Sequence, residues 1–207
     1  MRIIKPSFEI ITPIDRVAIL KLIEECGRVC YRSEHKITED SYIDFVAMLL
    51  KRGHEAVIEH VSFTVKFICD RGVSHEIVRH RIASYCQEST RYCNYSDERF
   101  GEELTVIEPC FWEEGSPPYK YWLYAMQYLE ATYIELLKEG STPQEARSVL
   151  PNSLKTEIVM TANAREWRHF FKLRTAKAAH PQMRELVLPL LTRFQIEIPE
   201  LFGDITY

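Results

Sequence analysis

Residues Val61 to Cys69 read VSFTVKFIC, in which apolar side chains recur at every second position. That period puts one face of an extended chain against a core, so the stretch predicts a half-buried β-strand. Asp70-Arg71-Gly72 ends the strand, and a short helix is expected from about Val73 towards the arginines beyond it. Strands are also predicted for three further stretches: Arg2 to Ile11, Leu104 to Glu108 and Leu154 to Ala162.

Helices are predicted around these strands, each from a capping signal or a helical period. The clearest pattern starts at Thr38, where apolar residues recur three and four positions apart until Gly53 ends it. The other predicted helices run from Thr12-Pro13 to Tyr31, from Ser116-Pro117-Pro118 to about Gly140, from the capping box Thr142-Pro143-Gln144-Glu145, from the cap pair Asn163 and Glu166, and from Pro181 to about Ile196. The polar run Ser84 to Arg99 is expected to be a functional loop.

The pattern as a whole predicts an α/β fold, a helix-rich single domain over residues 1–207 with a small mixed sheet. A chain of 207 residues with 46% hydrophobic composition can bury one proper core. The sequence holds no G-x-G-x-x-G or Walker pattern, so neither a Rossmann nor a P-loop unit is expected.

Charge and cysteine content restrict the functional class. The net charge is −4, so a whole-protein positive field for nucleic-acid binding is not expected. The six cysteines include no C-x-x-C pair and are interpreted as free thiols in a reducing compartment. Neither a signal segment nor an apolar run of membrane-spanning length is seen, so the protein is expected to be cytoplasmic, with no membrane partner.

The segment from Arg79 to Arg91 concentrates arginines and hydroxyl residues. Between Arg71 and Arg91, four arginines stand against Glu76 and Glu88, a local balance of +2 in a negatively charged chain. Forked guanidinium groups suit phosphate recognition. From composition alone, a solvated basic loop is the favoured explanation of the segment.

The spacing in this segment resembles the signature RHRxxSxxxxSxR of the flavin-dependent thymidylate synthases. The matching residues are Arg79, His80, Arg81, Ser84, Ser89 and Arg91. The resemblance continues in the same order through most of the chain, at Gly53-His54-Glu55, Glu59-His60, Ala146-Arg147, Leu150-Pro151, Asn163-Ala164-Arg165 and Leu173-Arg174.

This resemblance implies an enzyme that makes dTMP from dUMP by reductive methylation, a methyltransferase. It implies FAD as the cofactor, NADPH or NADH as the reductant of the flavin, and 5,10-methylenetetrahydrofolate as the carbon donor. The family further implies a homotetramer whose active sites are shared between subunits, with dUMP and the folate as small-molecule partners and no nucleic acid.

The resemblance also implies which residues bind each ligand. The residues implied for FAD are His54, Arg79, His80, Arg81, Gln87, Asn163, Arg165 and His169. Those implied for dUMP are Glu76, Ile77, Val78, Arg79, Gln87, Glu88, Ser89, Thr90, Arg91, Arg147 and Arg174. Arg174 matches the arginine that the family uses to stabilise the uracil deprotonated at N3, a task suited to a permanently charged group.

Four positions depart from the family pattern and put individual hydrogen bonds in question. Ala56 stands where many relatives carry a hydroxyl residue near the flavin. Glu76 replaces a common glutamine, Gln87 stands where glutamate can stand, and His169 where asparagine can stand.

Metal and cysteine chemistry are weighed against this interpretation. His75 and His80 lie five positions apart, whereas two ligands on one helical face need a spacing of four, so no metal site is expected. Cys86 lies inside the signature and is the natural candidate for a thiolate nucleophile, but the family needs no cysteine there. Two other hypotheses stay open at this point: a nucleic-acid-binding module that uses the basic loop, and a metal-dependent nucleotide hydrolase that uses the histidines.

Overall fold

The computed structural model describes residues 1–95 and 103–207, and it divides into two compact units. Unit 1 comprises Met1–Phe8, Phe67–Arg79 and Tyr85–Val159. Unit 2 comprises Glu9–Lys66, His80–Ser84 and Met160–Tyr207. Each unit is assembled from segments far apart in the chain, so residues distant in sequence meet inside each one.

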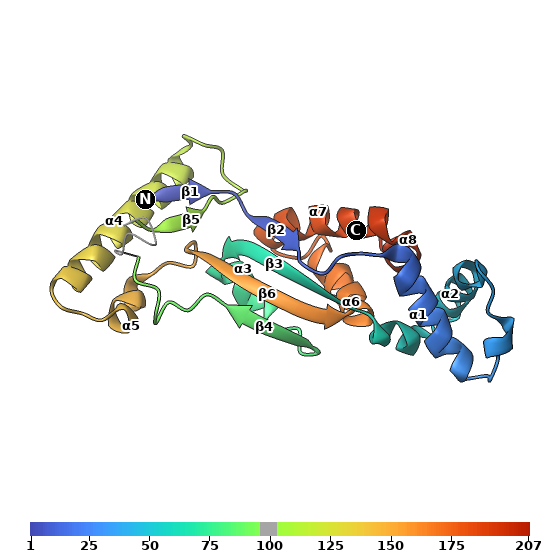
Figure 1. Cartoon of the computed structure of the whole chain (residues 1–207). Coiled ribbons are helices and arrows are strands. Elements are labelled where there is room, and N and C mark those ends of the chain that lie inside the picture. The colour runs from blue at the N-terminus through green and yellow to red at the C-terminus, as the bar shows by residue number, and fades with distance from the viewer. Residues whose placement is uncertain (96–102) are drawn as a thin grey trace. The chain divides into compact units, whose positions relative to one another are not determined.

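Two small sheets replace the single sheet expected from sequence (Figure 1). In one, β1 (Arg2–Ile4) pairs in parallel with β5 (Thr105–Ile107). The other has the order β2-β3-β6-β4, with β2 at Ser7–Ile10. The single strand predicted for Arg2 to Ile11 is therefore wrong. It breaks at Lys5-Pro6, where proline has no N–H to donate to a ladder.

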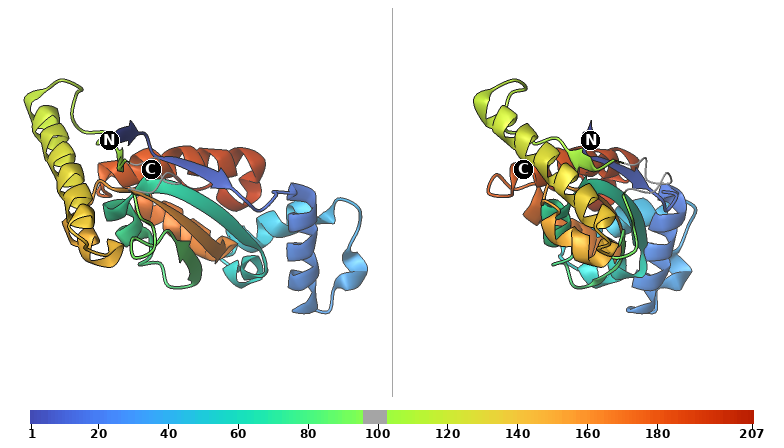
Figure 2. Two further views of the ribbon diagram at one scale, coloured as in Figure 1. Left: turned by 60° about the vertical axis from the view of Figure 1, so that its left-hand side comes forward. Right: turned by 90° about the vertical axis from the view of Figure 1, so that its left-hand side faces the viewer.

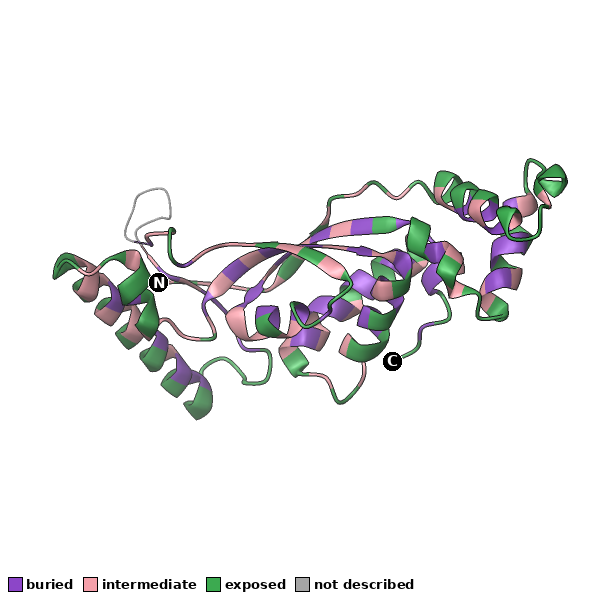
Figure 3. Ribbon diagram, turned by 90° about the horizontal axis from the view of Figure 1, so that it is seen from below, coloured by how far each residue is buried: buried purple, intermediate pink, exposed green. Residues whose placement is uncertain are grey.

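The two alternating stretches form the long strands that the sequence predicts. β3 spans Ser62–Asp70 and β6 spans Lys155–Asn163. Buried residues alternate with half-buried or exposed ones along most of both strands, as Figure 3 shows. These strands carry the chain from one unit into the other, and each leads directly into a helix that holds candidate site residues.

The predicted functional loop is wrong at its start. Ala83–Gln87 forms strand β4, with exposed and half-buried residues in alternation. The sequence did not predict this strand because few of its residues are large and apolar, so the alternation typical of a strand is weak and the polar composition resembles that of a loop. Glu88 to Tyr95 lies outside helices and strands, and residues 96–99 of the predicted loop fall outside the described residues.

Unit 2 contains the helices α1 (Arg16–Val29), α2 (Ser41–Lys51), α6 (Ala164–Arg174), α7 (Pro181–Glu197) and α8 (Pro199–Phe202), together with the short 3-10 helices η1 (Glu34–Lys36) and η2 (Glu55–His60). The first two helices begin later than predicted. Asp15 rather than Thr12 caps α1, accepting from the N–H of Ala18, and Thr38 lies before α2 with its N–H bonded to Ser41 Oγ.

An aromatic core fixes α6 inside unit 2. Trp167 is fully buried and donates its Nε1–H to the carbonyl of Phe63 on β3 at 3.0 Å. Phe171 and Phe194 lie with ring centroids 5.4 Å apart, joining α6 to α7, which runs beside it (Figure 2). Such buried aromatic contacts hold a helix in one orientation, so they also fix the backbone positions of the polar residues on α6.

Unit 1 contains α3 (Arg71–Ile77), α4 (Pro117–Lys138), α5 (Pro143–Ala146) and the 3-10 helix η4 (Arg147–Val149). Both bonds of the predicted capping box at Thr142 and Glu145 are present. Gly140 follows α4 with φ +91°, a left-handed conformation that suits glycine. The predicted helix-rich α/β class is confirmed.

None of the described helices combines the length and the apolar character needed to cross a lipid bilayer.

Candidate functional site

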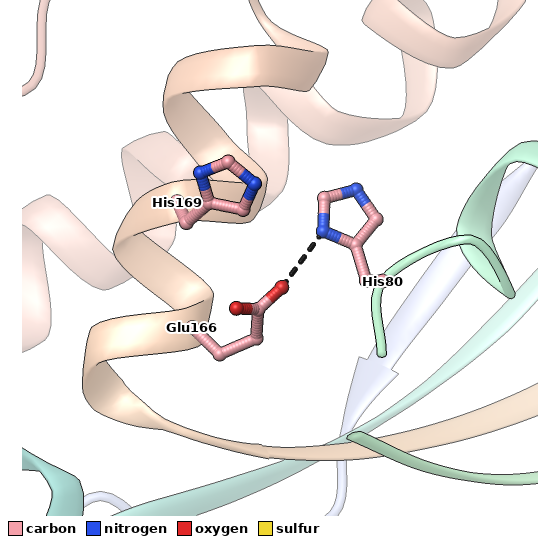
Figure 4. A group of neighbouring side chains, drawn as sticks. All are labelled: His80, Glu166 and His169. Atoms are coloured by element: carbon pink, nitrogen blue, oxygen red, sulfur yellow. Dashed lines mark hydrogen bonds and ion pairs between the residues drawn. The ribbon is translucent and has the colours of Figure 1, made fainter. Parts of the chain in front are cut away.

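A hydrogen-bonded cluster in unit 2 centres on His80, the histidine of the signature (Figure 4). His80 Nδ1 lies 2.9 Å from Glu166 Oε1, and Arg174 Nε donates to His80 Nε2 over 3.1 Å. The His80 ring also meets Phe170 edge-on at a centroid distance of 4.8 Å. The imidazole is therefore engaged at both nitrogens and along its face.

The three partners of His80 come from one side of α6. Glu166, Phe170 and Arg174 follow one another at intervals of four, which places them in a row along the helix. Asn163 caps this helix by accepting the N–H of Glu166 at 2.9 Å. In a capping box the Glu166 carboxylate would return to the Asn163 N–H, but here it binds His80 instead. The predicted cap pair is thus half formed, because the carboxylate has a tertiary partner.

Burial and charge favour the neutral form of the His80 imidazole. Desolvation lowers the pKa of His80 below its ordinary value of 6.5, and the neighbouring Arg174 charge lowers it further, while the hydrogen bond to Glu166 opposes both effects. His80 is 4% exposed, so the cost of charging it is not relieved by water.

The same cluster contains a potential cation site that sequence spacing does not reveal. Ligand atoms of His80, Glu166 and His169 lie within 4.8 Å of one another. His75, the residue compared with His80 in the sequence, is not part of this group, because the partners of His80 lie on α6. Glu166 and His169 are three apart on that helix, a spacing that indicates a shared face. Because Arg174 donates to Nε2, Nδ1 carries the proton and faces Glu166, which favours a hydrogen-bond network over metal ligation.

Two adjoining cavities in unit 2 lie next to this cluster. One, of about 520 Å³, is lined by residues that include Asn163, Glu166 and His169. The second, of about 370 Å³, is lined by residues that include Gly27, Tyr31, His54 and Ala56. Glu55 and Arg165 line both, so they form the wall that the two cavities share. Both volumes are typical of small-molecule sites.

Arg165, in the wall that the two cavities share, lies beside two carboxylates. Its Nη1 lies 2.6 Å from Glu59 Oε1, and its Nε lies 3.6 Å from Glu55 Oε2. The Arg165 side chain is 53% exposed. An anionic ligand that binds Arg165 must therefore compete with two carboxylates.

In unit 1, the end of the signature segment, from Glu88 to Arg91, forms a turn whose side chains face in different directions. Glu88 points inward, and its carboxylate accepts from Lys155 Nζ at 3.1 Å, from Tyr95 O–H at 2.9 Å and from the N–H of Glu157 at 3.3 Å. Ser89 Oγ accepts the N–H of Arg91 at 3.3 Å, closing the turn. These two side chains shape the loop, a role that sequence could not assign because Lys155 and Glu157 lie on β6.

Two arginines reach the outer side of this turn. Arg91 Nη2 donates to Gln144 Oε1, and Arg147 Nη1 donates to Thr90 Oγ1, both at 3.5 Å. Both arginines are exposed, whereas Thr90 is buried. The loop and the α5–η4 turn thus present two guanidinium groups around one turn, a geometry suited to a phosphate.

The remaining expected residues of unit 1 differ in accessibility. The Ile77 side chain is fully buried in α3, and its carbonyl accepts from Tyr85 O–H at 3.0 Å. Gln87 Nε2 donates to Ser74 Oγ at 2.9 Å and to Thr156 Oγ1 at 3.3 Å. Glu76 is half-buried, and Val78 and Arg79 at the end of α3 are exposed.

The other expected residues lie at the surface. Arg81 is exposed in unit 2, in the segment between His80 and β4. Cys86 is an exposed free thiol on β4 in unit 1, like the other five cysteines in having no disulfide among the described residues. Arg174 belongs to unit 2, whereas most of the expected nucleotide residues belong to unit 1.

Comparison with known proteins gives a consistent family. A family model described as thymidylate synthase complementing protein matches residues 14–200. A flavin-dependent thymidylate synthase of Pyrococcus abyssi is 34% identical over 180 residues, covering 86% of this chain and 73% of that protein. One of Geobacter sulfurreducens is 34% identical over 185 residues, covering 86% and 78%.

Solved structures give the same fold. A UMP/dUMP methylase, PolB, from Streptomyces cacaoi, bound with 5-Br dUMP, has a TM-score of 0.77 over 98% of this chain and 96% of that one. Its sequence identity is 21%, so this likeness concerns the fold.

Proposed function

Because the chain belongs to the thymidylate synthase complementing protein family, we propose that it is a flavin-dependent thymidylate synthase. It is a methyltransferase that converts dUMP to dTMP, with 5,10-methylenetetrahydrofolate as carbon donor and NADPH-reduced FAD as hydride source. The whole chain, residues 1–207, acts as a single catalytic domain in the cytoplasm.

One observation carries the proposal within the chain itself. His54 and Ala56, before β3, line a cavity that adjoins the one lined by Asn163 and His169, and Arg165 lies in the wall between them. These residues are separated by about half the chain, yet the family resemblance assigns four of the five to the flavin and names the fifth, Ala56, as a departure close to it. Convergence of assigned residues on one pair of cavities is what a cofactor site requires.

The donor set of these cavities fits FAD. FAD joins a flavin to an adenosine through a pyrophosphate, and two cavities with an arginine between them match that division. Arg165 would bind the pyrophosphate, with Arg81 as a further cation, while Asn163 and His169 would donate to the flavin ring. Bound flavin would supply the hydride that completes the methyl group.

The dUMP phosphate is assigned to Arg91 and Arg147, which flank the turn at Ser89 and Thr90. Glu88 and Gln87 contribute by holding that turn, since their polar atoms are bonded to β6 and α3. Glu76, Ile77 and Val78 contribute from the end of α3, where Ile77 can offer only its backbone because its side chain is buried.

Arg79 is proposed to serve both dUMP and FAD, with His80 and Arg81 beside it on the flavin side. Arg174 is the catalytic residue: its fixed charge stabilises the uracil once N3 is deprotonated. In a homotetramer with shared sites, the Ser89 turn of one subunit would meet Arg174 of another. Light scattering of the FAD-loaded protein would report this assembly, and full activity as a monomer at nanomolar concentration would contradict it.

The absorbance spectrum of the purified protein tests the function. A flavin band near about 450 nm is expected, and dUMP should perturb it because the nucleotide binds beside the flavin. Arg165→Ala should lose FAD. Arg193→Ala is the matched control, because Arg193 is another exposed arginine of unit 2 paired with a glutamate. A colourless protein that gains no flavin band with added FAD would overturn the proposal.

A further inference from the structure

The protonation pattern of His80 follows from its neighbours. A guanidinium is always protonated, so Arg174 Nε can only donate to His80 Nε2, which lies 3.1 Å away. Nε2 must therefore hold a lone pair. In a neutral imidazole the proton then resides on Nδ1, where it donates to Glu166 Oε1 at 2.9 Å. The three groups form one directed chain, from Arg174 through His80 to Glu166.

We propose that Glu166 is a positioning residue that holds His80 in its Nδ1-protonated tautomer and thereby orients the guanidinium of Arg174. This inference rests on the proposed function, in which Arg174 stabilises the deprotonated uracil. In this role Glu166, which also lines one of the proposed flavin cavities, acts on Arg174 through His80.

The local structure supports a dedicated role for Glu166. Its side chain is 11% exposed. A glutamate at this position in the first turn of α6 could accept the N–H of Asn163, but the Glu166 carboxylate is bonded to His80 instead. By contrast, Glu145 occupies the same position in α5 and makes both capping bonds. Glu166 therefore contributes less to its helix than sequence predicts, and its carboxylate is directed at the imidazole.

The geometry makes Arg174 sensitive to the His80 tautomer. Nε joins the side chain to the planar guanidinium group, so a hydrogen bond at Nε sets the direction in which both Nη atoms point. If the proton of His80 moved to Nε2, two donors would face each other across this contact and Arg174 would turn away. An acceptor at Nδ1 prevents that move, as a carboxylate or carbonyl does for other functional histidines.

A test can read the tautomer directly. The protein is labelled with ¹⁵N-histidine and loaded with FAD, because protonated and unprotonated imidazole nitrogens resonate in separate ranges. His80→Asn identifies the signals of His80. In the wild type Nδ1 should appear protonated and Nε2 unprotonated. Glu166→Leu should shift the proton to Nε2, while Glu166→Gln should retain much of the original state because its amide oxygen can accept the same bond.

Activity should follow the tautomer. With Glu166→Leu, kcat should fall about 10- to 100-fold, by analogy with the loss seen when the partner that orients a metal-ligating histidine is removed. The kcat of Glu166→Gln should lie between those of Glu166→Leu and the wild type. Glu24→Gln is the matched control, since Glu24 is a buried carboxylate of unit 2 paired with Arg28 and remote in sequence from the cluster. It should leave the His80 signals unchanged even if it lowers stability.

A double-mutant cycle decides whether Glu166 acts through Arg174. In an Arg174→Ala background, Glu166→Leu should cost little further activity, measured by tritium release from 5-[³H]-dUMP. An equal loss in both backgrounds would overturn the proposal, as would a wild-type His80 protonated at Nε2 or a tautomer that Glu166→Leu does not move. If the wild type gave the expected His80 signals but formed no dTMP, the proposed function would fail and the tautomer assignment would stand.

Discussion

Arg168 on α6 and Asp204, after α8, form a two-point ion pair, with Nη1 2.6 Å from Oδ1 and Nη2 2.7 Å from Oδ2. Arg168 is buried, and it also donates to Glu55 at 3.3 Å and to the carbonyl of Leu201. This arrangement fastens the residues after α8 to the helix that carries the His80 cluster and to the wall of the proposed flavin cavities.

Asp204→Asn should lower the free energy of unfolding by about 1 kcal/mol at neutral pH. The buried guanidinium of Arg168 loses a charged acceptor. The loss of stability is smaller than for a buried ion pair, because the Asp204 side chain is 61% exposed and water screens its charge. Urea denaturation measures the change. Glu113→Gln, which changes an exposed carboxylate outside the helices and strands, is the control and should be neutral.

The same variant should flatten the acid dependence of stability. The hydrogen bond to Arg168 lowers the pKa of Asp204 below its ordinary value of 3.8. A carboxyl with a lowered folded pKa stabilises the protein above its unfolded pKa, and this contribution is lost as pH falls through the folded pKa. Wild type should therefore lose more stability than Asp204→Asn from about pH 5 downward. Parallel curves would show that the pair contributes nothing.

Arg91→Ala and Arg147→Ala should each raise the KM for dUMP about 10- to 100-fold, because each removes a charge-assisted contact proposed for the phosphate. The kcat should change little, since the phosphate does not react. Steady-state kinetics at saturating FAD measures both constants. Lys138→Ala, which removes an exposed cation of α4, should leave them unchanged. Loss of flavin with an unaltered KM would refute the phosphate assignment.

Glu59→Gln should tighten FAD binding by up to about fivefold. It removes the carboxylate that would compete with the pyrophosphate for Arg165 in the proposed flavin site, and an exposed ion pair of this kind is worth at most about 1 kcal/mol. Fluorescence titration of the flavin-free protein with FAD measures the Kd. Weaker binding by this variant would mean that Glu59 orients Arg165 for the ligand instead of competing with it.

Cys86→Ala should retain most activity, whereas Arg174→Ala should lose about 10²- to 10³-fold in kcat. In the proposed mechanism, the uracil ionised by Arg174 would supply the carbanion character at C5 that a thiolate adduct would otherwise provide. Both variants are compared at saturating FAD, by tritium release from 5-[³H]-dUMP and by dTMP formation. An inactive, flavin-loaded Cys86→Ala beside an active Arg174→Ala would reverse the assignment.

Local signals in the sequence were enough for the elements and the family. The alternation at Val61 to Cys69 predicted β3, and the capping box at Thr142 predicted α5, because each signal lies within one turn or one strand. The signature from Arg79 to Arg91 indicated the family, which the match over residues 14–200 confirmed. Even so, sequence merged β1 with β2 and read β4 as a loop, since pairing partners decide a strand and they lie elsewhere in the chain.

The directions of the charged side chains were decided by tertiary structure alone. Sequence predicted Glu166 as a cap, but Glu166 faces His80 from 86 positions away. Glu88, which the family resemblance assigned to the nucleotide, faces Lys155 from 67 positions away. From sequence, a carboxylate can be matched only with hydrogen-bond donors close to it in the chain. Only the packing of Trp167 against Phe63, and of β6 beside β4, brings the stronger partners within hydrogen-bond distance and excludes the water that would compete for them.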